Sequence, residues 1–336
     1  MVRDRIAALA LCAAIGMLAG ACHANDRVKV SVYQSVSDAG IYIANDRGYF
    51  KAENIDIDLI QLDAVSSVVT ALASGQVDVA GGAPSAAIYN AFRQGIGIRI
   101  VADKGSMRQG AGYLGLVVRK AVEGEIKVAG DLKGRKVAWT GYGSGTTNDV
   151  ALDRMLAASS LKDSDISLQN LTFGDSLAAL ATGSVDAAYL IEPLMQSAEQ
   201  RGIGKILLTG DRIYLNQQVA VLLYSSEFCG KTDLARRFMT AYLKGVRDYN
   251  DAFAKNKDRA AIVDILSKNT NVKKPELYAA MVMPGLDPNG AVNLAGMTSD
   301  MEWYLAKGFL KEKVDVSKVV DSSFQEQALK RLGPYQ

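Results

Sequence analysis

The fold of this chain is decided by a ten-residue pattern that occurs twice, as ALASGQVDVA at Ala71–Ala80 and as ALATGSVDAA at Ala179–Ala188. The copies begin 108 residues apart, and in each an Ala-Leu-Ala run that suits the end of a helix leads to Gly75 or Gly183. Glycine readily takes the left-handed conformation that closes a helix, and the Val and Ala residues that follow suit a short buried strand. We therefore predict two equivalent helix-to-strand corners of parallel sheets.

The duplication extends well beyond the decamer. In each half a strand, a helix, a second strand and a second helix precede the repeat, and the first strand lies 47 residues before it in one half and 48 in the other. Parallel strands need helical crossovers, which this order of elements supplies. The repeated β-α-β-α-β unit predicts an α/β fold with two doubly wound lobes.

Two apolar, β-rich runs lie outside the repeat, GYLGLVVR at Gly112–Arg119 and QVAVLLYS at Gln218–Ser225. We interpret them as crossover strands that carry the chain out of the first lobe and back again, which makes the second lobe an insertion. The predicted boundaries are 25–115 plus 222–336 for the first, discontinuous lobe and 116–221 for the second.

Residues 1–24 are predicted to be a secretory signal peptide, because Arg3 and Arg5 precede an apolar run that ends in small residues. The run is shorter than the roughly 20 residues that cross a bilayer. Leu18 lies four residues before Cys22, one more than in a bacterial lipoprotein signal. The pattern favours export as a soluble protein over a lipid anchor at Cys22.

Composition limits the chemistry of the mature chain. Removal of residues 1–24 takes away His23, the single histidine, and leaves Cys229 as the single cysteine. Without histidine the chain has neither a Ser-His-Asp nor a Cys-His mechanism, and it lacks the usual histidine-containing zinc site. A net charge of +2 without a long basic run gives no reason to expect nucleic acid. We expect no metal site and no nucleic-acid partner.

The candidate ligand residues follow from the position of ligands in open α/β sheets, just beyond the carboxyl ends of the strands. Residues 144–147 open a helix after a glycine-rich loop, where free N–H groups favour an anion, although an ordinary Ser/Thr cap explains the same pattern. Four aromatic residues at strand ends suit a planar or apolar ligand body. The candidates are Tyr33, Ser35, Ser37, Asp38, Gly82, Ala83, Pro84 and Ser85 in the first lobe, and Trp139, Tyr142, Ser144, Gly145, Thr146, Thr147, Tyr189 and Glu192 in the second.

Several of these candidates have a second, purely structural interpretation. Asp38 is a good N-cap for the helix that follows it, Glu192 stands in a turn beside Pro193, and any one aromatic ring is more often packed than used in recognition. The sequence leaves open whether Lys104 and Arg108 reach the ligand.

Four segments carry a family resemblance: GYFKAENIDIDLI at 48–60, ALASGQVDVAGGAPSA at 71–86, GSGTT at 143–147 and VDAAYLIEP at 185–193. In this order and spacing the mature chain resembles the periplasmic substrate-binding proteins of the nitrate, sulfonate, taurine and thiamine-precursor ABC importers. The resemblance implies a type II clamshell that closes on a small molecule by hinge motion. It also implies a monomer that performs no chemistry, needs no cofactor, and delivers its ligand to a membrane permease and the associated ATPase.

Two cargo classes and one enzyme class follow from these features. The first interpretation is a small organic anion, a sulfonate or a carboxylate with an aromatic or bulky body. The alternative cargo is a heterocycle such as a thiamine pyrimidine precursor or a flavin, and an inward-facing Glu192 would disfavour a purely anionic ligand such as nitrate. The enzyme alternative is a pyrimidine synthase of thiamine biosynthesis, which shares the fold; it is disfavoured because such enzymes are cytosolic and consume a histidine.

Overall fold

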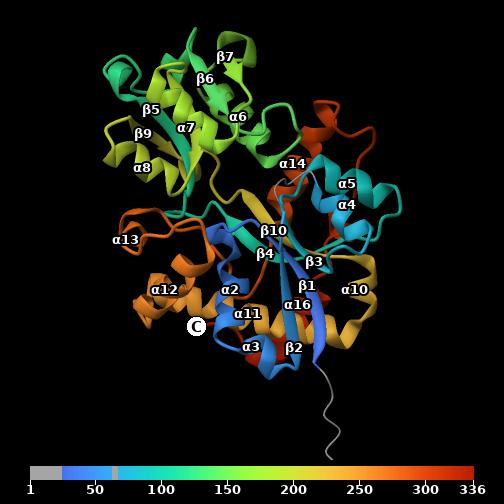
Figure 1. The fold of residues 1–336 in the computed structure, drawn as a ribbon. Helices are drawn as coiled ribbons and strands as arrows, with labels where there is room; N and C mark the ends of the chain where they lie inside the picture. The colour runs from blue at the N-terminus through green and yellow to red at the C-terminus, as the bar shows by residue number, and fades with distance from the viewer. Residues whose placement is uncertain (1–24, 63–66) are drawn as a thin grey trace, which may run out of the picture.

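The computed structural model describes residues 25–62 and 67–336, and it has two α/β lobes, each built on a five-stranded sheet (Figure 1). The predicted signal peptide at 1–24 lies outside the described residues. The predicted two-lobed α/β fold is confirmed.

The first sheet has the strand order β2-β1-β3-β10-β4. β1 is parallel to β2 and β3, whereas β10 is antiparallel to both β3 and β4. The carboxyl ends of β1, β3 and β4 therefore lie at the same edge. The strands are β1 (Asp26–Val32), β2 (Ile55–Gln61), β3 (Val79–Gly82), β4 (Arg99–Ser106) and β10 (Gln218–Tyr224).

The second sheet repeats this arrangement with the order β7-β6-β8-β5-β9. β6 is parallel to β7 and β8, and β5 is antiparallel to β8 and β9. The strands are β5 (Leu114–Arg119), β6 (Lys136–Trp139), β7 (Ser167–Gln169), β8 (Ala187–Ile191) and β9 (Gly204–Thr209).

The repeated decamer forms the same corner in both lobes. The glycines at 75 and 183 have φ angles of +70° and +79°, the left-handed conformation that the sequence predicts. The repeated aspartates make equivalent hydrogen bonds, since Asp78 accepts the backbone N–H of Lys29 at 2.9 Å and Asp186 accepts that of Lys136 at 3.1 Å. Each aspartate therefore ties its corner to the first strand of its own sheet.

The two predicted crossover runs form internal antiparallel strands of the sheets. β5 lies wholly in the second sheet and β10 wholly in the first, so the chain passes between the sheets in residues 107–113 and 210–217. These two passages are paired, because Met107 N–H donates to the Gln217 carbonyl at 2.9 Å and Asn216 N–H donates to the Met107 carbonyl at 2.7 Å.

Helices cover both sheets, and the residues after β10 return to the first lobe as a helical segment (Figure 1). Within the described residues, no helix combines the length and the apolar character needed to cross a bilayer. The α-helices are α2 (Ala39–Asp46), α3 (Tyr49–Ala52), α4 (Val68–Ala73), α5 (Ala86–Arg93), α6 (Thr147–Ala158), α7 (Phe173–Thr182), α8 (Leu194–Gln200), α9 (Gly210–Ile213), α10 (Ser226–Gly230), α11 (Thr232–Ala254), α12 (Arg259–Asn269), α13 (Leu277–Ala280), α14 (Leu294–Ala306), α15 (Val316–Val319) and α16 (Ser323–Leu332). Short 3₁₀ turns occupy Val36–Asp38, Lys120–Val122, Ala129–Leu132 and Asp163–Asp165.

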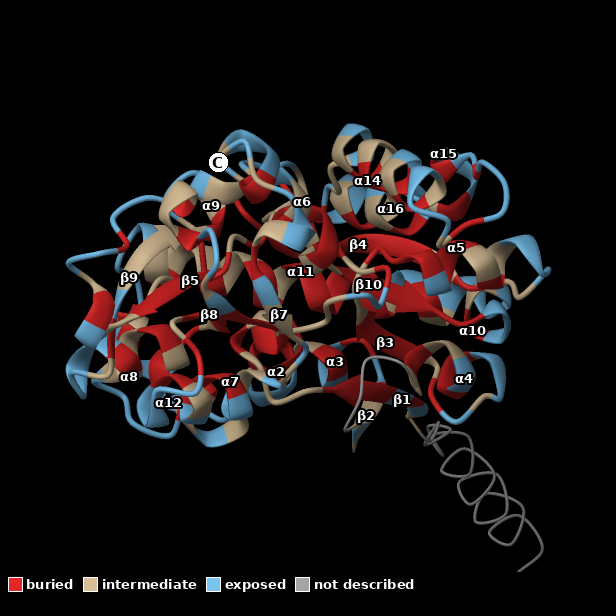
Figure 2. Cartoon of the chain, turned by 90° about the horizontal axis from the view of Figure 1, so that it is seen from above, coloured by how far each residue is buried: buried red, intermediate tan, exposed pale blue. Residues whose placement is uncertain are grey.

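The core of the first lobe is built around the longest helix, α11, which packs against α2, α3 and α16. Apolar residues of α11 recur at helical spacing, and Phe238, Tyr242 and Tyr249 are buried. Figure 2 shows buried strands in the middle of each lobe and exposed residues on the outer faces of the helices. This packing fixes the strand ends that carry the candidate ligand residues.

Candidate ligand site

We use "interlobe site" for the strand-end loops of both sheets, residues 33–38 and 83–85 of the first lobe and residues 140–147 and 192 of the second. Two sets of contacts bring them together. Ala86 N–H donates to the Gly145 carbonyl across the lobes at 3.0 Å. Inside the first lobe Asn271 N–H donates to the Gln34 carbonyl at 2.8 Å, and further along the chain Val282 N–H donates to Glu192 of the second lobe at 3.1 Å.

The loop after β1 is organised by a fully buried carboxylate. One oxygen of Asp38 accepts the backbone N–H groups of Tyr33 at 3.0 Å and Ser35 at 3.1 Å. The hydroxyls of Ser35 and Ser37 lie 3.2 Å apart, and both residues are partly buried. Asp38 therefore shapes the loop from inside, while the two serines and Tyr33 lie closer to its surface.

Lys104 reaches this loop from β4, which answers one question that the sequence leaves open. Its ammonium lies 2.6 Å from the second oxygen of Asp38 and donates to the Ser37 hydroxyl at 3.2 Å, and its side chain is 2% exposed. The side chain passes Gly81 of β3, where an added Cβ would lie 2.6 Å from the Lys104 Cε. Glycine at position 81 thus makes room for a buried ion pair that links β4 to the loop after β1.

The loop after β3 forms part of the contact between the lobes. Gly82 and Ala83 are partly buried, whereas Pro84 and Ser85 are buried, and the Pro84 carbonyl accepts the Tyr304 hydroxyl at 3.0 Å. The carbonyl of Pro84 is therefore committed to α14, and the exposed part of this loop is its beginning.

The glycine-rich loop of the second lobe surrounds a carboxylate of its own chain. Asp149, in the first turn of α6, accepts the backbone N–H groups of Gly143 at 2.7 Å, Ser144 at 3.1 Å and Thr146 at 3.1 Å. Asp149 is buried, and burial raises the pKa of its carboxyl. The N–H groups of Ser144 and Thr146, which the sequence assigns to an anionic ligand, are thus occupied. The Thr146-x-x-Asp149 spacing of a capping box is the sequence signal for this arrangement.

The remaining residues of this loop differ in exposure. Ser144 is exposed, Gly145 is buried against Phe309 and Ala86 of the first lobe, and Thr146 is partly buried. Thr147 is buried, and its carbonyl accepts the Gln217 side-chain amide at 2.7 Å. Part of the loop thus supports contacts between the lobes and the crossover.

The expectation that all four strand-end aromatic rings face a ligand is corrected for two of them. Trp139 and Tyr189 are 0% and 1% exposed and stack on each other, with ring centroids 4.0 Å apart and an interplanar angle of 8°. The Trp139 indole N–H donates to the Asn148 carbonyl at 2.9 Å. Both rings belong to the core of the second lobe, so only Tyr33 and Tyr142, which are partly buried, stay candidates.

Glu192 joins the lobes through backbone contacts. One carboxylate oxygen accepts the N–H of Val282 in the first lobe at 3.1 Å, and the other accepts the N–H of Gln196 in α8 at 3.2 Å. Glu192 is 7% exposed, and burial raises the pKa of its carboxyl. This geometry makes Glu192 a contact between the lobes in the present conformation.

Glu192→Ala is expected to shift the lobes toward an open arrangement, because a hydrogen bond to a charged group contributes about 1.5–3 kcal/mol. The ratio of closed to open molecules should fall by about tenfold or more, which small-angle X-ray scattering of the unliganded protein would detect. Glu199→Ala is the matched control, since Glu199 accepts a backbone N–H at 2.9 Å inside the second lobe. Equal scattering curves for Glu192→Ala and the control would contradict the role of Glu192.

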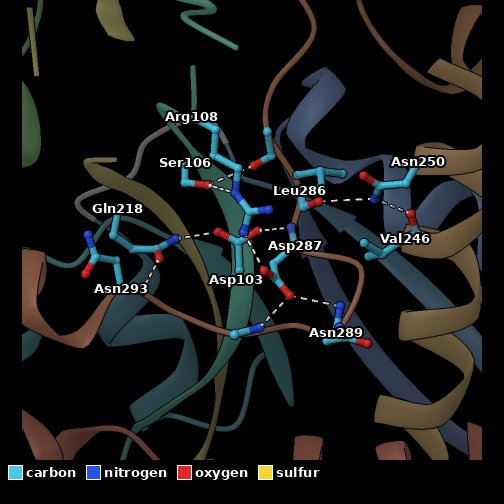
Figure 3. Close-up of polar contacts among 12 residues, drawn as sticks. Asp103, Ser106, Arg108, Gln218, Val246, Asn250, Leu286, Asp287, Asn289 and Asn293 are labelled. Carbon is cyan, nitrogen blue, oxygen red and sulfur yellow. Dashed lines mark hydrogen bonds and ion pairs between the residues drawn. The ribbon is translucent and has the colours of Figure 1, made fainter. Parts of the chain in front are cut away.

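A polar network beside the crossover holds the end of β4 (Figure 3). The buried Asp103 accepts the Gln218 side-chain amide at 2.6 Å and the backbone N–H of Asp287 at 2.7 Å. Arg108 forms an ion pair with Asp287 and donates to the Ser106 hydroxyl at 3.2 Å. Burial raises the pKa of Asp103 to about 6. Arg108 is therefore committed to this network beside the crossover.

A further contact between the lobes joins α6 to α14 and the residue that follows it. Arg154 of α6 donates to the Ser299 hydroxyl at 2.8 Å, and Lys307 pairs with Asp153 at 2.6 Å. These groups belong to different lobes, so they hold one side of the interlobe site closed.

Burial of Asp300 in α14 is expected to make the free energy of unfolding depend on pH. It accepts the Tyr214 hydroxyl at 2.9 Å, and burial raises its pKa from 3.8 to about 6. Folding therefore favours its protonated form, so its unfavourable contribution grows as the pH rises from about 4 to about 6 and is complete above that range. Asp300→Asn keeps the acceptor, and should be nearly neutral at pH 4 but stabilising by about 2–3 kcal/mol at pH 7.5.

Urea unfolding at the two pH values measures this difference. Asp315→Asn is the control, because that carboxyl is exposed and its pKa is lowered by the Ser317 side chain. An Asp300→Asn effect that is the same at both pH values would contradict the prediction.

The comparisons with known proteins place this geometry in a family. The family model described as "NMT1/THI5 like" matches residues 36–254. The chain belongs to the NMT1/THI5-like family. This match confirms the family resemblance drawn from the sequence, and solved sulphonate-binding and nitrate-binding proteins share the fold.

This NMT1/THI5-like chain spans about half the length of the curated relatives that it matches. A putative thiamine biosynthesis protein of Haemophilus influenzae is 28% identical over 46% of this chain and 46% of the relative. A putative aliphatic sulfonates-binding protein of Escherichia coli is 29% identical over 47% of each.

Solved structures share the fold over nearly the whole chain. The periplasmic aliphatic sulphonate binding protein SsuA from Escherichia coli has a TM-score of 0.71 at 20% identity, covering 88% of this chain and 92% of that one. The nitrate-binding protein NrtA from Synechocystis PCC 6803 has a TM-score of 0.75 at 16% identity, covering 92% and 89%. The desulfurization enzyme DSZB has a TM-score of 0.64 at 18% identity, covering 92% and 100%. At these identities the likeness concerns the fold, which solute-binding proteins and an enzyme share.

Proposed function

We propose that this NMT1/THI5-like protein is the periplasmic solute-binding component of an ABC importer. It acts as a monomer that captures a small organic molecule between its lobes and delivers it to a membrane permease and the associated ATPase. The observation that carries the proposal is the meeting of strand-end loops from two duplicated sheets, joined across the lobes by Ala86 with Gly145 and by Glu192 with Val282. Such an arrangement suits capture by hinge closure.

We propose that the protein performs no chemistry on its cargo. Cys229, the single cysteine after residue 24, lies in α10, and burial raises the pKa of its thiol to about 11. A thiol with such a pKa is a poor nucleophile at neutral pH. The absence of histidine from the chain after residue 24 also speaks against the pyrimidine-synthase alternative. Turnover of any bound compound would favour that alternative.

An organic anion, a sulfonate or carboxylate with an aromatic or bulky body, is the first cargo considered. The names of SsuA and NrtA as sulphonate-binding and nitrate-binding proteins support it. A heterocycle is the second cargo class. It is favoured because the Asp149 carboxylate occupies the glycine-rich loop in which the sequence pattern predicts a bound anion.

Binding is tested by thermal-shift screening of the mature chain with a panel of sulfonates, carboxylates and uncharged heterocycles. A ligand that binds the folded state raises the melting temperature in proportion to the logarithm of its concentration over its Kd. Saturable stabilisation by a member of either class supports the proposed function, and a panel without a stabilising member contradicts it.

A further inference from the structure

We infer that the cargo of the interlobe site is an uncharged or cationic organic molecule and not an organic anion, an inference that rests on the proposed function and narrows it. The inference comes from the charges that this chain places at its strand ends. An anion bound there would need a source of positive potential, either helix N-termini or basic side chains.

Helix N-termini are the first such source, because their free N–H groups attract anions. In three places the chain supplies its own carboxylate. Asp38 accepts two N–H groups of the loop before α2, and Asp149 accepts three from the loop that leads into α6. Glu192 accepts the N–H of Gln196 in the first turn of α8. Each of these termini therefore has a negative charge of the chain beside it, the loop donors before α2 and α6 are occupied, and α8 has lost one donor of its first turn.

The start of α5 is the fourth terminus at the site. Its N-cap Ser85 is buried, and the first N–H of the helix, that of Ala86, donates to the Gly145 carbonyl of the other lobe. The leading donor of this helix is thus used in closing the lobes.

Basic side chains are the second source. The sequence places neither lysine nor arginine in the strand-end segments 33–38, 83–86, 140–147 and 192–194. Lys104 reaches the loop after β1, but its charge is balanced by Asp38 at 2.6 Å. Arg108 is paired with Asp287. The two cations at the side of the site, Arg154 and Lys307, are held by Ser299 and Asp153. An anion among the strand-end segments would therefore meet paired cations and the negative charges of Asp149 and Glu192, and a buried charge without a partner is costly.

Neutral hydrogen-bonding groups remain for recognition. The hydroxyls of Tyr33, Thr140 and Thr146 are buried and lack a hydrogen-bond partner among the described residues, and Ser35 and Ser37 lie beside Tyr33. A hydroxyl both donates and accepts, so it pairs with an uncharged amide or ring nitrogen. Together with the rings of Tyr33 and Tyr142, this set suits a polar, uncharged organic molecule.

Matched compounds that differ in charge test the inference. We would titrate the mature chain at pH 7.5 with benzamide and benzoate, nicotinamide and nicotinate, and benzenesulfonamide and benzenesulfonate, using calorimetry and thermal shift. The uncharged member of a binding pair is expected to bind at least about tenfold more tightly than its acid. An acid that binds as tightly as its amide overturns the inference and leaves the proposed function in place. Failure of every compound to bind contradicts the proposed function and the inference with it.

A variant of Asp149 tests the cause. Asp149→Asn keeps the size and one acceptor of the side chain but removes its charge, so benzenesulfonate is expected to gain about tenfold in affinity while benzenesulfonamide changes little. Asp131→Asn is the control, because Asp131 also accepts two backbone N–H groups in the second lobe but precedes β6, at the opposite end of the sheet. Equal sulfonate affinity in Asp149→Asn and the control overturns the role of Asp149.

Discussion

Lys104→Met is expected to lower the free energy of unfolding by about 3–5 kcal/mol, because it leaves the charge of Asp38 buried without its partner. The two side chains are 2% and 0% exposed, and their charged atoms lie 2.6 Å apart. Asp38 also holds the N–H groups of Tyr33 and Ser35, so the loss should loosen the loop after β1. Cargo affinity should fall together with stability.

Urea unfolding of Lys104→Met, Asp38→Asn and the double variant measures the coupling between the two residues. The double variant should be more stable than the sum of the single losses predicts, because neither charge is then left alone. Lys313→Met is the control, since Lys313 pairs with Glu302 on the surface with side chains 65% and 54% exposed, and such pairs contribute about 0–1 kcal/mol. A Lys104→Met loss no larger than that of the control would contradict the prediction.

The frame of the protein could be predicted from sequence because it depends on local signals. The repeated glycines close helices in both lobes with positive φ, and the repeated Asp78 and Asp186 occupy equivalent corners. These features need only a few neighbouring residues, so a decamer written twice is enough to predict two similar lobes.

The Lys104–Asp38 pair could not be predicted, because its partners lie far apart in sequence and meet only through the order of the sheet. β10, which comes from the far end of the insertion, lies between β3 and β4. The side chain of Lys104 must pass Gly81 of β3 to reach the loop after β1. Sequence patterns indicate where strands occur, but not which strand is inserted between two others.

The loop around Asp149 shows a different limit. A Ser/Thr-rich helix start predicts both an anion site and an ordinary cap, and the choice depends on which group accepts the N–H hydrogens. Here the capping spacing from Thr146 to Asp149 was available in the sequence, and it favours the cap. Local spacing therefore carried more information than the glycine pattern.

Trp139→Ala is expected to lower the free energy of unfolding by about 3–5 kcal/mol, the usual loss when a large aromatic side chain is removed from a core. Trp139 is 0% exposed, stacks on Tyr189 at 4.0 Å and donates to the Asn148 carbonyl. The stacked pair contributes about 0.5–1.5 kcal/mol beyond the buried area. Its place at the end of the four-residue strand β6 made it a ligand candidate, since so short a strand does not reveal which face is buried.

Trp139→Phe separates a core role from a ligand role. If Trp139 is a core residue, Trp139→Phe should lower the free energy of unfolding. The tightest ligand of the panel should keep its affinity for this variant at a temperature where the variant is folded. Tyr142→Ala provides the matched contrast, because Tyr142 is only partly buried, so its loss should affect ligand affinity more than stability. Reduced affinity in Trp139→Phe with unchanged unfolding would return Trp139 to the ligand site. Reduced stability with unchanged affinity in Trp139→Phe would show that the stacked rings fix the ends of β6 and β8. Those strand ends lead into the loop around Asp149 and to Glu192, the contact between the lobes.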